Sequence, residues 1–432
     1  MLVDELYARS SFKSISKILD GYVLEDLQCA DIMTALCAKH SIFRYDTGTG
    51  KTLLASAVMK LLKREDSTRK FLFIGKASQV IQTPLKIKQC TGLSILATSA
   101  EASSLAENVY SGKFLNYDIL MITHEALNDA SLMITLHKYR KHFCGVIIDE
   151  AHELSNYITA DRALMMQAMN RYFEYVFALT ATPMKSNLGE LTRLMHSVDP
   201  NLVKSAEDAE DWIKEDASRL KTCWTGLLLS RSREDFGVKG TFLTHVHFVE
   251  AMKHQAGANG MNMFKITRGE GAVSQANKLV EIINGYKPSQ GLVYIRQHAI
   301  RNYVTGILDD AGISYGCING KTSMAERAKT IDDFEKKKID IIITSVTTAL
   351  DLDCDYIVFY EFTLDFKQML GRAYRGLNPK TLNIDFIFTR HTAEMDYFMS
   401  KIFDRALLVK NIMNQDCQEI IDAAKELKYF CD

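Results

Sequence analysis

The feature that most constrains the fold is a recurrence of short apolar, β-branched runs, separated by stretches long enough for a helix. Strands that helices cover on both faces are almost continuously apolar, whereas strands with one wet face alternate. The sequence therefore predicts an α/β protein with parallel sheets. The runs are KFLFIG (70–75), YDILMIT (117–123), FCGVIIDE (143–150), YVFALTATP (175–183), GLVYI (291–295), ISYGCING (313–320), IDIIITSV (339–346), DYIVFYEF (355–362) and NIDFIFTR (383–390).

These runs fall into two groups, which predicts two parallel-sheet lobes in tandem. The stretch 251–275, rich in glycine and without apolar periodicity, separates the groups and is typical of a linker or surface segment. After residue 392 the spacing of MDYFMSKIFDRALLVKNIM is that of an amphipathic helix, so we expect a helical C-terminus. The predicted domains are a first lobe at 1–235, a linker at 236–275 and a second lobe at 276–432.

Composition narrows the class of protein. The chain has 432 residues, 47% hydrophobic and 24% charged, which are ordinary globular values. A formal net charge of -1 excludes a generally basic nucleic-acid coat but leaves room for a local basic groove. Nine cysteines without a CxxC pair favour free thiols in a reducing compartment over disulfides or zinc. With neither a secretion-type N-terminus nor a long apolar run, we expect a cytoplasmic protein without membrane contacts.

The run YDTGTGKT (45–52) has the pattern of a phosphate-binding loop. Gly48 and Gly50, on either side of Thr49, let backbone N–H groups approach phosphate oxygens; Lys51 reaches the β- and γ-phosphates and the Thr52 hydroxyl suits Mg²⁺. The alternative is a surface turn before a helix. Tyr45 stands where such loops usually open with a small residue, and we predict that it packs beside the loop, away from the phosphates.

A phosphate loop needs a carboxylate at the end of another strand. VIIDEAHE (146–153) runs from an apolar strand directly into two acids. Asp149 is placed to hold Mg²⁺ through water and Glu150 to activate the attacking water. An exposed strand end is the alternative interpretation.

Two further motifs extend this pattern. LTATP (179–183) is a strand that ends in hydroxyl residues. In QMLGRAYRG (368–376), Arg372 and Arg375 are three residues apart and share a helix face, which suits arginine fingers on a transferring phosphoryl group. A solvated basic helix face is the simpler reading of that motif taken alone.

Together these motifs resemble a known family. GTGKT, DEAH, TATP and QMLGRAYRG occur in the order of motifs I, II, III and VI of the superfamily 2 helicases and translocases, and the resemblance covers roughly 20–400. Within the superfamily the chain looks closest to SWI/SNF-type translocases, on the stretches LEDLQ (24–28), LTATPMKSNLGELTRLMHSVDP (179–200) and LLLSRSREDF (227–236). This resemblance implies two RecA-like lobes, with ATP bound in the cleft between them.

The resemblance also implies roles for particular residues. Motif V here lacks its usual glycine. By this resemblance MgATP is bound and hydrolysed by Lys51, Thr52, Asp149 and Glu150. The resemblance assigns adenine to Gln28, the ribose to Asp351 and the coupling of the two lobes to His152. It also implies that the second lobe completes the site with Gln368, Arg372 and Arg375.

Nucleic acid in this family runs across strand ends and is held largely through phosphates, so we expect low sequence specificity and marked salt dependence. DNA is favoured over RNA by the SWI/SNF-like motif III, on resemblance only. Residues at strand ends or in the loops that follow are the candidate contacts. They are Lys76, Thr123, His124, Lys185, Arg296, Lys321, Thr322, Thr344 and Thr347.

The sequence thus predicts an ATP-dependent DNA translocase or helicase. An RNA-stimulated helicase and an ATP-binding recruitment protein with little turnover remain open alternatives. The short segment between the lobes, without reader domains, favours a minimal bacterial or phage enzyme over a chromatin remodeller. Its expected protein partners act in replication, recombination or repair, in a bacterial cell or a phage-infected host.

Overall fold

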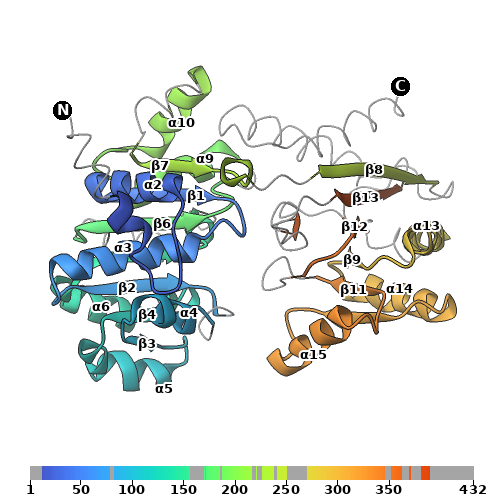
Figure 1. Ribbon diagram of the computed structural model, residues 1–432, viewed down its shortest axis with the longest axis horizontal. Helices are drawn as coiled ribbons and strands as arrows, with labels where there is room; N and C mark the ends of the chain where they lie inside the picture. Colours follow the sequence, from blue (N-terminus) through green and yellow to red (C-terminus); the bar gives the residue numbers. More distant parts are fainter. Residues whose placement is uncertain are drawn as a thin grey trace. The chain divides into compact units, whose positions relative to one another are not determined.

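The computed structural model forms two compact units, at 1–236 and 237–432, and each is considered by itself (Figure 1). The helical C-terminus expected after residue 392 lies outside the described part of the chain. The structure describes residues 12–77, 82–155, 170, 172–184, 187–216, 220, 226–237, 241–250, 270–345, 352–361, 369–370 and 381–389.

The first unit contains a seven-stranded sheet in the order β3-β4-β2-β5-β6-β1-β7, with every pairing parallel. Its central strands are buried along nearly their whole length, as their apolar runs predict. The strands are β1 (His40–Tyr45), β2 (Lys70–Gly75), β3 (Ile95–Ala97), β4 (Ile119–Thr123), β5 (Phe143–Asp149), β6 (Tyr175–Thr180) and β7 (Leu228–Arg231).

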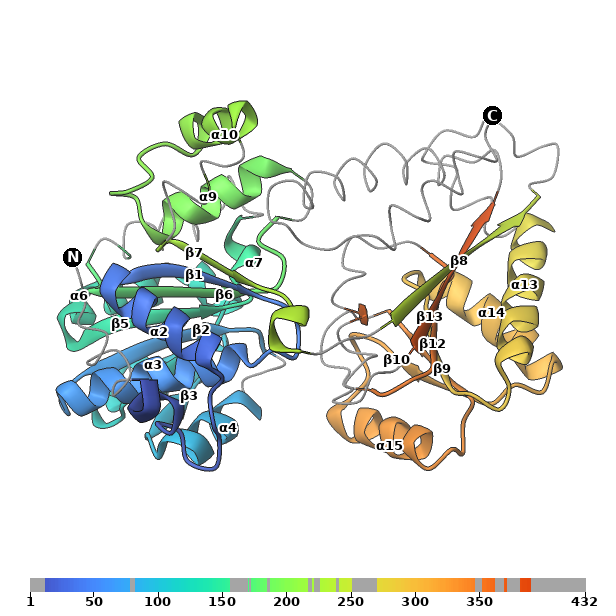
Figure 2. The ribbon, with the colours of Figure 1, turned by 45° about the horizontal axis from the view of Figure 1, so that its top comes forward.

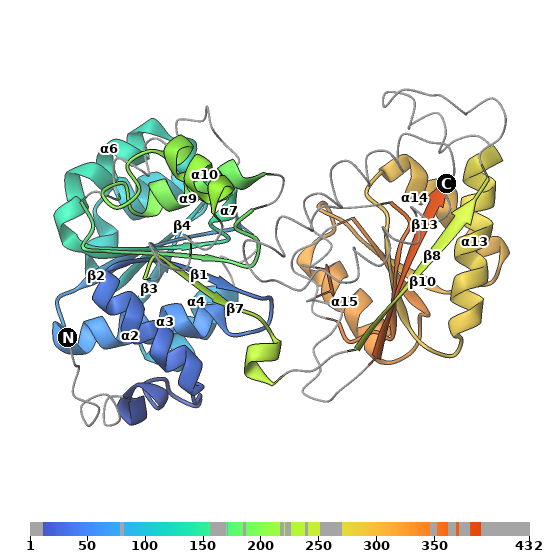
Figure 3. The same cartoon turned by 90° about the horizontal axis from the view of Figure 1, so that it is seen from above.

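Helices cover both faces of this sheet. In Figure 3, α2, α3 and α4 lie on one face and α6, α7 and α9 on the other. The helices are α2 (Asp26–Ala38), α3 (Lys51–Glu65), α4 (Gln82–Thr91), α5 (Ala102–Leu105), α6 (Ala130–Tyr139), α7 (His152–Ser155), α9 (Leu188–Val198) and α10 (Ala206–Glu215); short turns are η2 (Ala106–Tyr110), η3 (Lys113–Asn116), η4 (Glu125–Asn128), η5 (Arg140–His142) and η6 (Glu234–Phe236).

A buried cluster fixes α2 and α3 against the strands that carry the site. Leu54, Val58 and Leu62 of α3 pack with Phe43 of β1 and Phe177 of β6 in one apolar core. Burying a side chain of this size stabilises the fold by about 1.5–3 kcal/mol. The start of α3, and therefore the loop before it, is held in place by this packing.

The second unit contains a six-stranded parallel sheet in the order β10-β11-β9-β12-β13-β8. α13 and α14 lie on one face of this sheet, and α15 lies on the other (Figures 2 and 3). None of the described helices of the chain is both long and apolar enough to span a bilayer. The elements are β8 (Thr241–Val249), α13 (Glu270–Tyr286), β9 (Gly291–Tyr294), α14 (His298–Asp310), β10 (Tyr315–Ile318), α15 (Met324–Glu335), β11 (Ile341–Thr344), β12 (Tyr356–Phe359) and β13 (Thr381–Thr389).

One strand falls where the sequence suggested a linker. β8 lies inside the segment 236–275, yet it pairs with β13 along nine residues as the end strand of the second sheet. α13 also begins in that segment, at Glu270. The second unit therefore includes β8 near the start of the predicted linker and the first residues of α13 at its end.

Candidate nucleotide-binding site

The loop between β1 and α3 has the backbone geometry of a phosphate cradle. Gly48 and Gly50 have φ of 86° and 92°, a left-handed conformation that side chains disfavour. Gly50 is the N-cap of α3, whose first residue is Lys51, so the loop amides lie at the positive end of a 15-residue helix. A Cβ on Gly50 would lie 2.9 Å from Nε2 of Gln28. Both glycines are thus favoured by conformation, and a Cβ on Gly50 would in addition displace the Gln28 amide.

Lys51 is folded back over this loop. Its Nζ donates to the carbonyl oxygens of Tyr45 and Asp46, at 2.9 and 3.2 Å. A phosphate oxygen can replace these two acceptors, because they are neutral and the ammonium group pairs more strongly with an anion.

Tyr45 packs beside the loop, as predicted from the sequence. Its side chain is fully buried between Phe43 and Phe236, with ring centroids 6.1 and 5.8 Å away. Its hydroxyl donates to Oδ2 of Asp31 on α2 at 2.6 Å, and Arg231 at the end of β7 binds both oxygens of the same carboxylate at 2.8 and 2.6 Å. Burial raises the pKa of Tyr45 far above its usual value, and the Asp31 charge adds to the rise. Tyr45 therefore ties β1 to α2 and leaves the phosphate side of the loop free.

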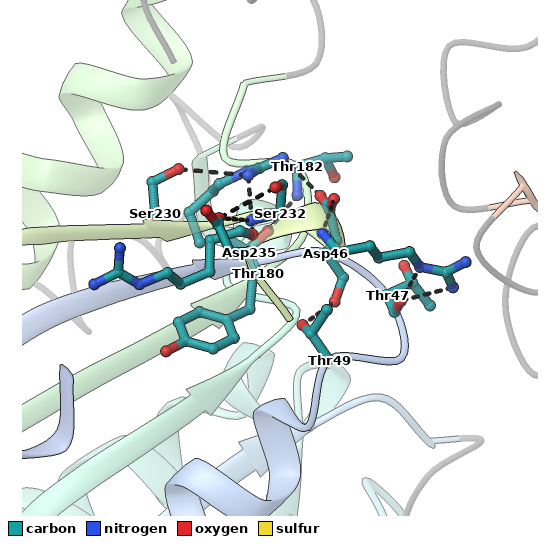
Figure 4. A network of polar contacts seen from close by, with 12 residues as sticks. Asp46, Thr47, Thr49, Thr180, Thr182, Ser230, Ser232 and Asp235 are labelled. Atoms are coloured by element: carbon teal, nitrogen blue, oxygen red, sulfur yellow. Dashed lines mark hydrogen bonds and ion pairs between the residues drawn. The ribbon is translucent and has the colours of Figure 1, made fainter. Parts of the chain in front are cut away.

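The segment after β7 clamps the outer side of the loop (Figure 4). Arg233 donates from Nε and a terminal nitrogen to the carbonyl oxygen of Thr47, at 2.9 and 2.8 Å. Its backbone N–H donates to Oδ2 of Asp46 at 3.2 Å, and the buried Arg44 holds Oδ1 of the same carboxylate at 2.6 Å. The Thr47 carbonyl and the Asp46 carboxylate are thus held by arginines of the chain, which fixes the outer side of the loop.

Gln28 supports the loop from α2. Its Nε2 donates to the carbonyl oxygen of Thr49 at 3.0 Å, and its Oε1 accepts from the backbone N–H of Glu25 at 3.0 Å. Each end of the amide makes one bond within the protein and retains a second N–H or lone pair, so Gln28 supports the loop without being excluded from contact with adenine.

Asp149 ends β5 and Glu150 follows it, and β5 is separated from β1 by β6 alone. Both are 6% exposed. Burial raises the pKa of Asp149 above its ordinary value, and the neighbouring Glu150 charge raises it further, whereas Lys51 acts in the opposite direction. Glu150 has a φ of 50°, an uncommon conformation for a residue with a side chain. A buried pair of acids beside a lysine is suited to bind a cation together with an anion.

His152 lies beneath these acids and is 1% exposed. Its Nδ1 lies 3.1 Å from Oγ1 of Thr180 and 3.4 Å from Oε2 of Glu150. Thr180 Oγ1 in turn accepts from the backbone N–H of Thr182 at 3.1 Å. The hydroxyl residues of LTATP thus contact the catalytic candidates through His152.

The candidate nucleic-acid contacts differ in accessibility. Thr123, His124 and Thr344 are at most 4% exposed, because each closes a buried strand or lies directly after one, and their side chains are not open to a phosphate. His124 Nε2 lies 2.7 Å from the carbonyl oxygen of Asp149, and burial lowers the pKa of its ring. Lys76 forms an ion pair with Glu153 at 3.2 Å. The remaining described candidates, Arg296, Lys321 and Thr322, lie in loops that follow β9 and β10, and Arg296 and Lys321 are exposed.

Several predicted site residues lie outside the described part of the chain, so their roles stay predictions. They are Lys185, Thr347, Asp351, Gln368, Arg372 and Arg375.

Sequence reasoning missed four residues that shape the site: Asp31, Arg231, Arg233 and Glu153. The stretch LLLSRSREDF contains Arg231 and Arg233, but its contact with a loop 186 residues earlier has no local signal in the sequence. Of the four, Glu153 alone could have been predicted from the sequence, because it directly follows the DEAH motif.

Comparison with known proteins gives two family matches. Residues 23–185 match the family described as "Type III restriction enzyme, res subunit", and residues 274–376 match "Helicase conserved C-terminal domain". The two matches cover more than half of the chain, and one falls in each unit.

Individual relatives are similar over parts of their length. The nuclear protein STH1/NPS1 of Saccharomyces cerevisiae is 27% identical over 206 residues, which cover 45% of this chain and 14% of that protein. A probable chromatin-remodeling complex ATPase chain of Oryza sativa subsp. japonica is 29% identical over 325 residues, covering 60% of this chain and 28% of that protein. The chain thus spans less than a third of either relative.

Among solved structures, the Sulfolobus solfataricus SWI2/SNF2 ATPase core in complex with dsDNA aligns with 93% of this chain and 95% of its own, at 18% identity and a TM-score of 0.43. The two family matches, in this order along two parallel-sheet units, together with the SWI/SNF-type relatives, place the chain in the superfamily 2 helicase family, where it resembles the SWI/SNF-type branch.

Proposed function

We propose that this chain is a nucleic-acid-stimulated ATPase that translocates on DNA. The observation that carries the proposal is the glycine cradle at the start of α3, with Lys51 inside it and the buried acids Asp149 and Glu150 two strands away. Family membership supports the same activity.

The described residues divide the chemistry between them. The loop amides and Lys51 bind the phosphates, because they supply hydrogen-bond donors and positive charge at a helix N-terminus. Glu150 takes the proton of the attacking water, and the surrounding burial strengthens its interactions. Mg²⁺ would be held by Thr52 and Asp149, whose buried carboxylate suits a cation, and would neutralise charge on the phosphate oxygens. Arg372 and Arg375 are proposed to complete the site.

The substrate is proposed to be duplex DNA, contacted through phosphates without sequence preference. Relatives described as chromatin-remodelling proteins support DNA over RNA. They are much longer than this chain, and their other activities are not transferred. A minimal bacterial or phage translocase, working in the cytoplasm with partners in replication, recombination or repair, stays our proposal for the biological setting.

The test is ATP hydrolysis by the wild type and Lys51→Ala, alone and with single-stranded DNA, duplex DNA or RNA. Lys88→Ala, on the exposed side of α4, is the matched control. We expect strong stimulation by duplex DNA that Lys51→Ala abolishes and Lys88→Ala retains. Movement is then measured as displacement of a third strand from a DNA triplex.

Other outcomes redirect the assignment. Stimulation by RNA alone would identify an RNA-stimulated helicase. An absence of hydrolysis with every nucleic acid, with ATP binding intact, would identify a recruitment protein.

A further inference from the structure

A chain of polar side chains connects the surface to the catalytic acid along the carboxyl edge of the first sheet. β2, β5 and β6 are neighbours in that sheet, and the chain consists of residues that end them or follow them. We call Lys76, Glu150, His152, Glu153 and Thr180 the strand-end network.

The outer end of the strand-end network is an ion pair. Nζ of Lys76 lies 3.2 Å from Oε1 of Glu153, and the two side chains are 21% and 28% exposed. A ligand phosphate can therefore reach Lys76 from solvent. Because a phosphate competes with a carboxylate for the same ammonium group, binding of nucleic acid here weakens the hold of Lys76 on Glu153.

The inner end is the buried ring of His152. Its Nε2 lies 3.4 Å from the same Oε1 of Glu153, while its Nδ1 faces Oε2 of Glu150 at 3.4 Å and Oγ1 of Thr180 at 3.1 Å. A neutral imidazole carries one N–H, so a hydrogen on Nε2 directed at Glu153 leaves Nδ1 as an acceptor. The charge environment of Glu153 thus influences whether the ring nitrogen that faces Glu150 carries a hydrogen.

We propose that the Lys76–Glu153 ion pair restrains Glu150 in the absence of nucleic acid, and that a nucleic-acid phosphate removes this restraint by taking Lys76 from Glu153. While Lys76 neutralises Glu153, the ring N–H stays on Nδ1 and donates toward Glu150. Once Lys76 leaves, Glu153 attracts the hydrogen to Nε2, and Nδ1 accepts from the Thr180 hydroxyl. Nδ1 releases its hydrogen to water beside Glu150, and Nε2 takes one from water that enters beside Glu153 when Lys76 leaves, with no net gain or loss.

In that second arrangement no N–H is directed at Oε2 of Glu150, and Glu150 accepts the proton of the attacking water more readily. Lys76 and Glu153 are positioning residues in this scheme, since they act on the reaction through His152. The proposal rests on the proposed function, because it explains how nucleic acid stimulates hydrolysis.

The two ends of the ion pair should give opposite results. Lys76→Met removes the restraint, and we expect kcat without nucleic acid to rise about fivefold or more, with little further stimulation. Glu153→Gln removes the group that attracts the hydrogen, so basal kcat does not rise and stimulation is lost. In the double variant Glu153→Gln prevails, because Glu153 acts after Lys76. KM for ATP stays near its wild-type value in all three.

Glu125→Gln is the matched control, because Glu125 is an exposed acid after the neighbouring strand β4 and is not part of the strand-end network. It should retain both the basal rate and the stimulation. An ion pair that only stabilises the fold would give Lys76→Met and Glu153→Gln the same loss. A Lys76 that only contacts nucleic acid would leave basal kcat unchanged in Lys76→Met. Either result would overturn the proposal.

A spectroscopic measurement tests the same step without altering the ion pair. Nitrogen-15 shifts of labelled histidine, with His152 assigned by its loss in His152→Gln, report which ring nitrogen carries the hydrogen. Duplex DNA should shift that population toward Nε2–H in the wild type and not in Glu153→Gln; no shift in the wild type contradicts the proposal. If no nucleic acid stimulates hydrolysis by the wild type, the proposed function fails. If stimulation survives in both Lys76→Met and Glu153→Gln, the proposed function stands and only the restraint by the ion pair is overturned.

Discussion

The Tyr45 side chain lies under the phosphate loop, on the side of α2, where it closes a buried cluster with Asp31 and Arg231. A position that usually holds a small residue accommodates a tyrosine here because the ring enters the core and its hydroxyl finds a charged acceptor. The unusual tyrosine of this motif thus serves to anchor the loop to α2, and it does not occupy the side of the loop that faces the phosphates.

Tyr45→Phe should destabilise the first unit and leave nucleotide binding almost unaffected. The change removes one hydrogen bond to a buried carboxylate, which costs about 1–3 kcal/mol in the free energy of unfolding. Urea unfolding measures this loss, and KM for ATP should stay within about twofold of wild type. Tyr172→Phe, on a ring that is 55% exposed, is the control. A rise in KM as large as that of Lys51→Ala would show that Tyr45 serves the phosphates.

Asp149→Asn should stabilise the metal-free protein while it abolishes hydrolysis. The folded state raises the pKa of Asp149, so this group favours the fold at low pH and the benefit is lost as pH rises through the folded-state pKa. The variant stays neutral, and its advantage in Tm should therefore grow from about pH 4, near the pKa of a free aspartate, toward neutrality.

Thermal unfolding in EDTA at several pH values measures this difference. Asp211→Asn, at a side chain that is 75% exposed, should show no such trend. A Tm gap that is constant across the pH series would contradict the role of the buried charge.

At the scale of elements, the segment that joins β7 to η6 completes a site whose other parts lie much earlier in the chain. Arg233 holds Thr47 and Asp46, while Arg231 reaches Asp31. The phosphate loop is therefore supported from α2 on one side and from the end of β7 on the other.

Arg233→Ala should loosen the loop and raise KM for ATP about tenfold or more, with a smaller change in kcat. Two hydrogen bonds from a charged group to Thr47 are lost, and the loop must be ordered again when nucleotide binds. Steady-state kinetics measures the effect. Arg64→Ala, at an exposed position near the end of α3, should behave as wild type. Equal kinetics in the two variants would remove Arg233 from the support of the loop.

The elements that sequence predicted best are those with continuous apolar runs. KFLFIG coincides with β2, and FCGVIIDE and YVFALTATP contain β5 and β6. β8 falls in the predicted linker because that prediction rests on the glycine-rich stretch 251–275; its own run TFLTHVHFV includes polar residues, which suits its place at the end of the sheet.

The site shows the same division. The positions of Lys51 at the start of a helix and of Asp149 and Glu150 at the end of a strand follow from local motifs. The Asp31–Arg231 and Lys76–Glu153 ion pairs depend on strand order, which brings distant segments together and leaves no periodic trace in the sequence.

At the scale of the molecule, two units with separate sheets and separate apolar cores divide the chain near residue 236. The nucleotide cradle and both acids belong to the first unit, whereas Arg372 and Arg375 belong to the sequence of the second.

A fragment of residues 1–236 should fold alone and bind ATP, but hydrolyse it no faster with nucleic acid than without. Its core and sheet are complete, so a single cooperative transition is expected in urea. Fluorescent-nucleotide titration measures binding, and a Lys51→Ala fragment is the control. Stimulated hydrolysis by the fragment would mean that the second unit is not needed for catalysis.

The position of β1 also has a consequence for how the protein is made. β1 leaves the ribosome before the other described strands, yet it lies between β6 and β7, and the Asp31–Arg231 ion pair joins residues 200 apart. At 5–20 residues per second, a nascent chain spends roughly 10–40 s with its phosphate loop translated but without the strand that secures it. The growing polypeptide should therefore become able to capture nucleotide late in the translation of this unit, only after the segment around Arg231 has emerged.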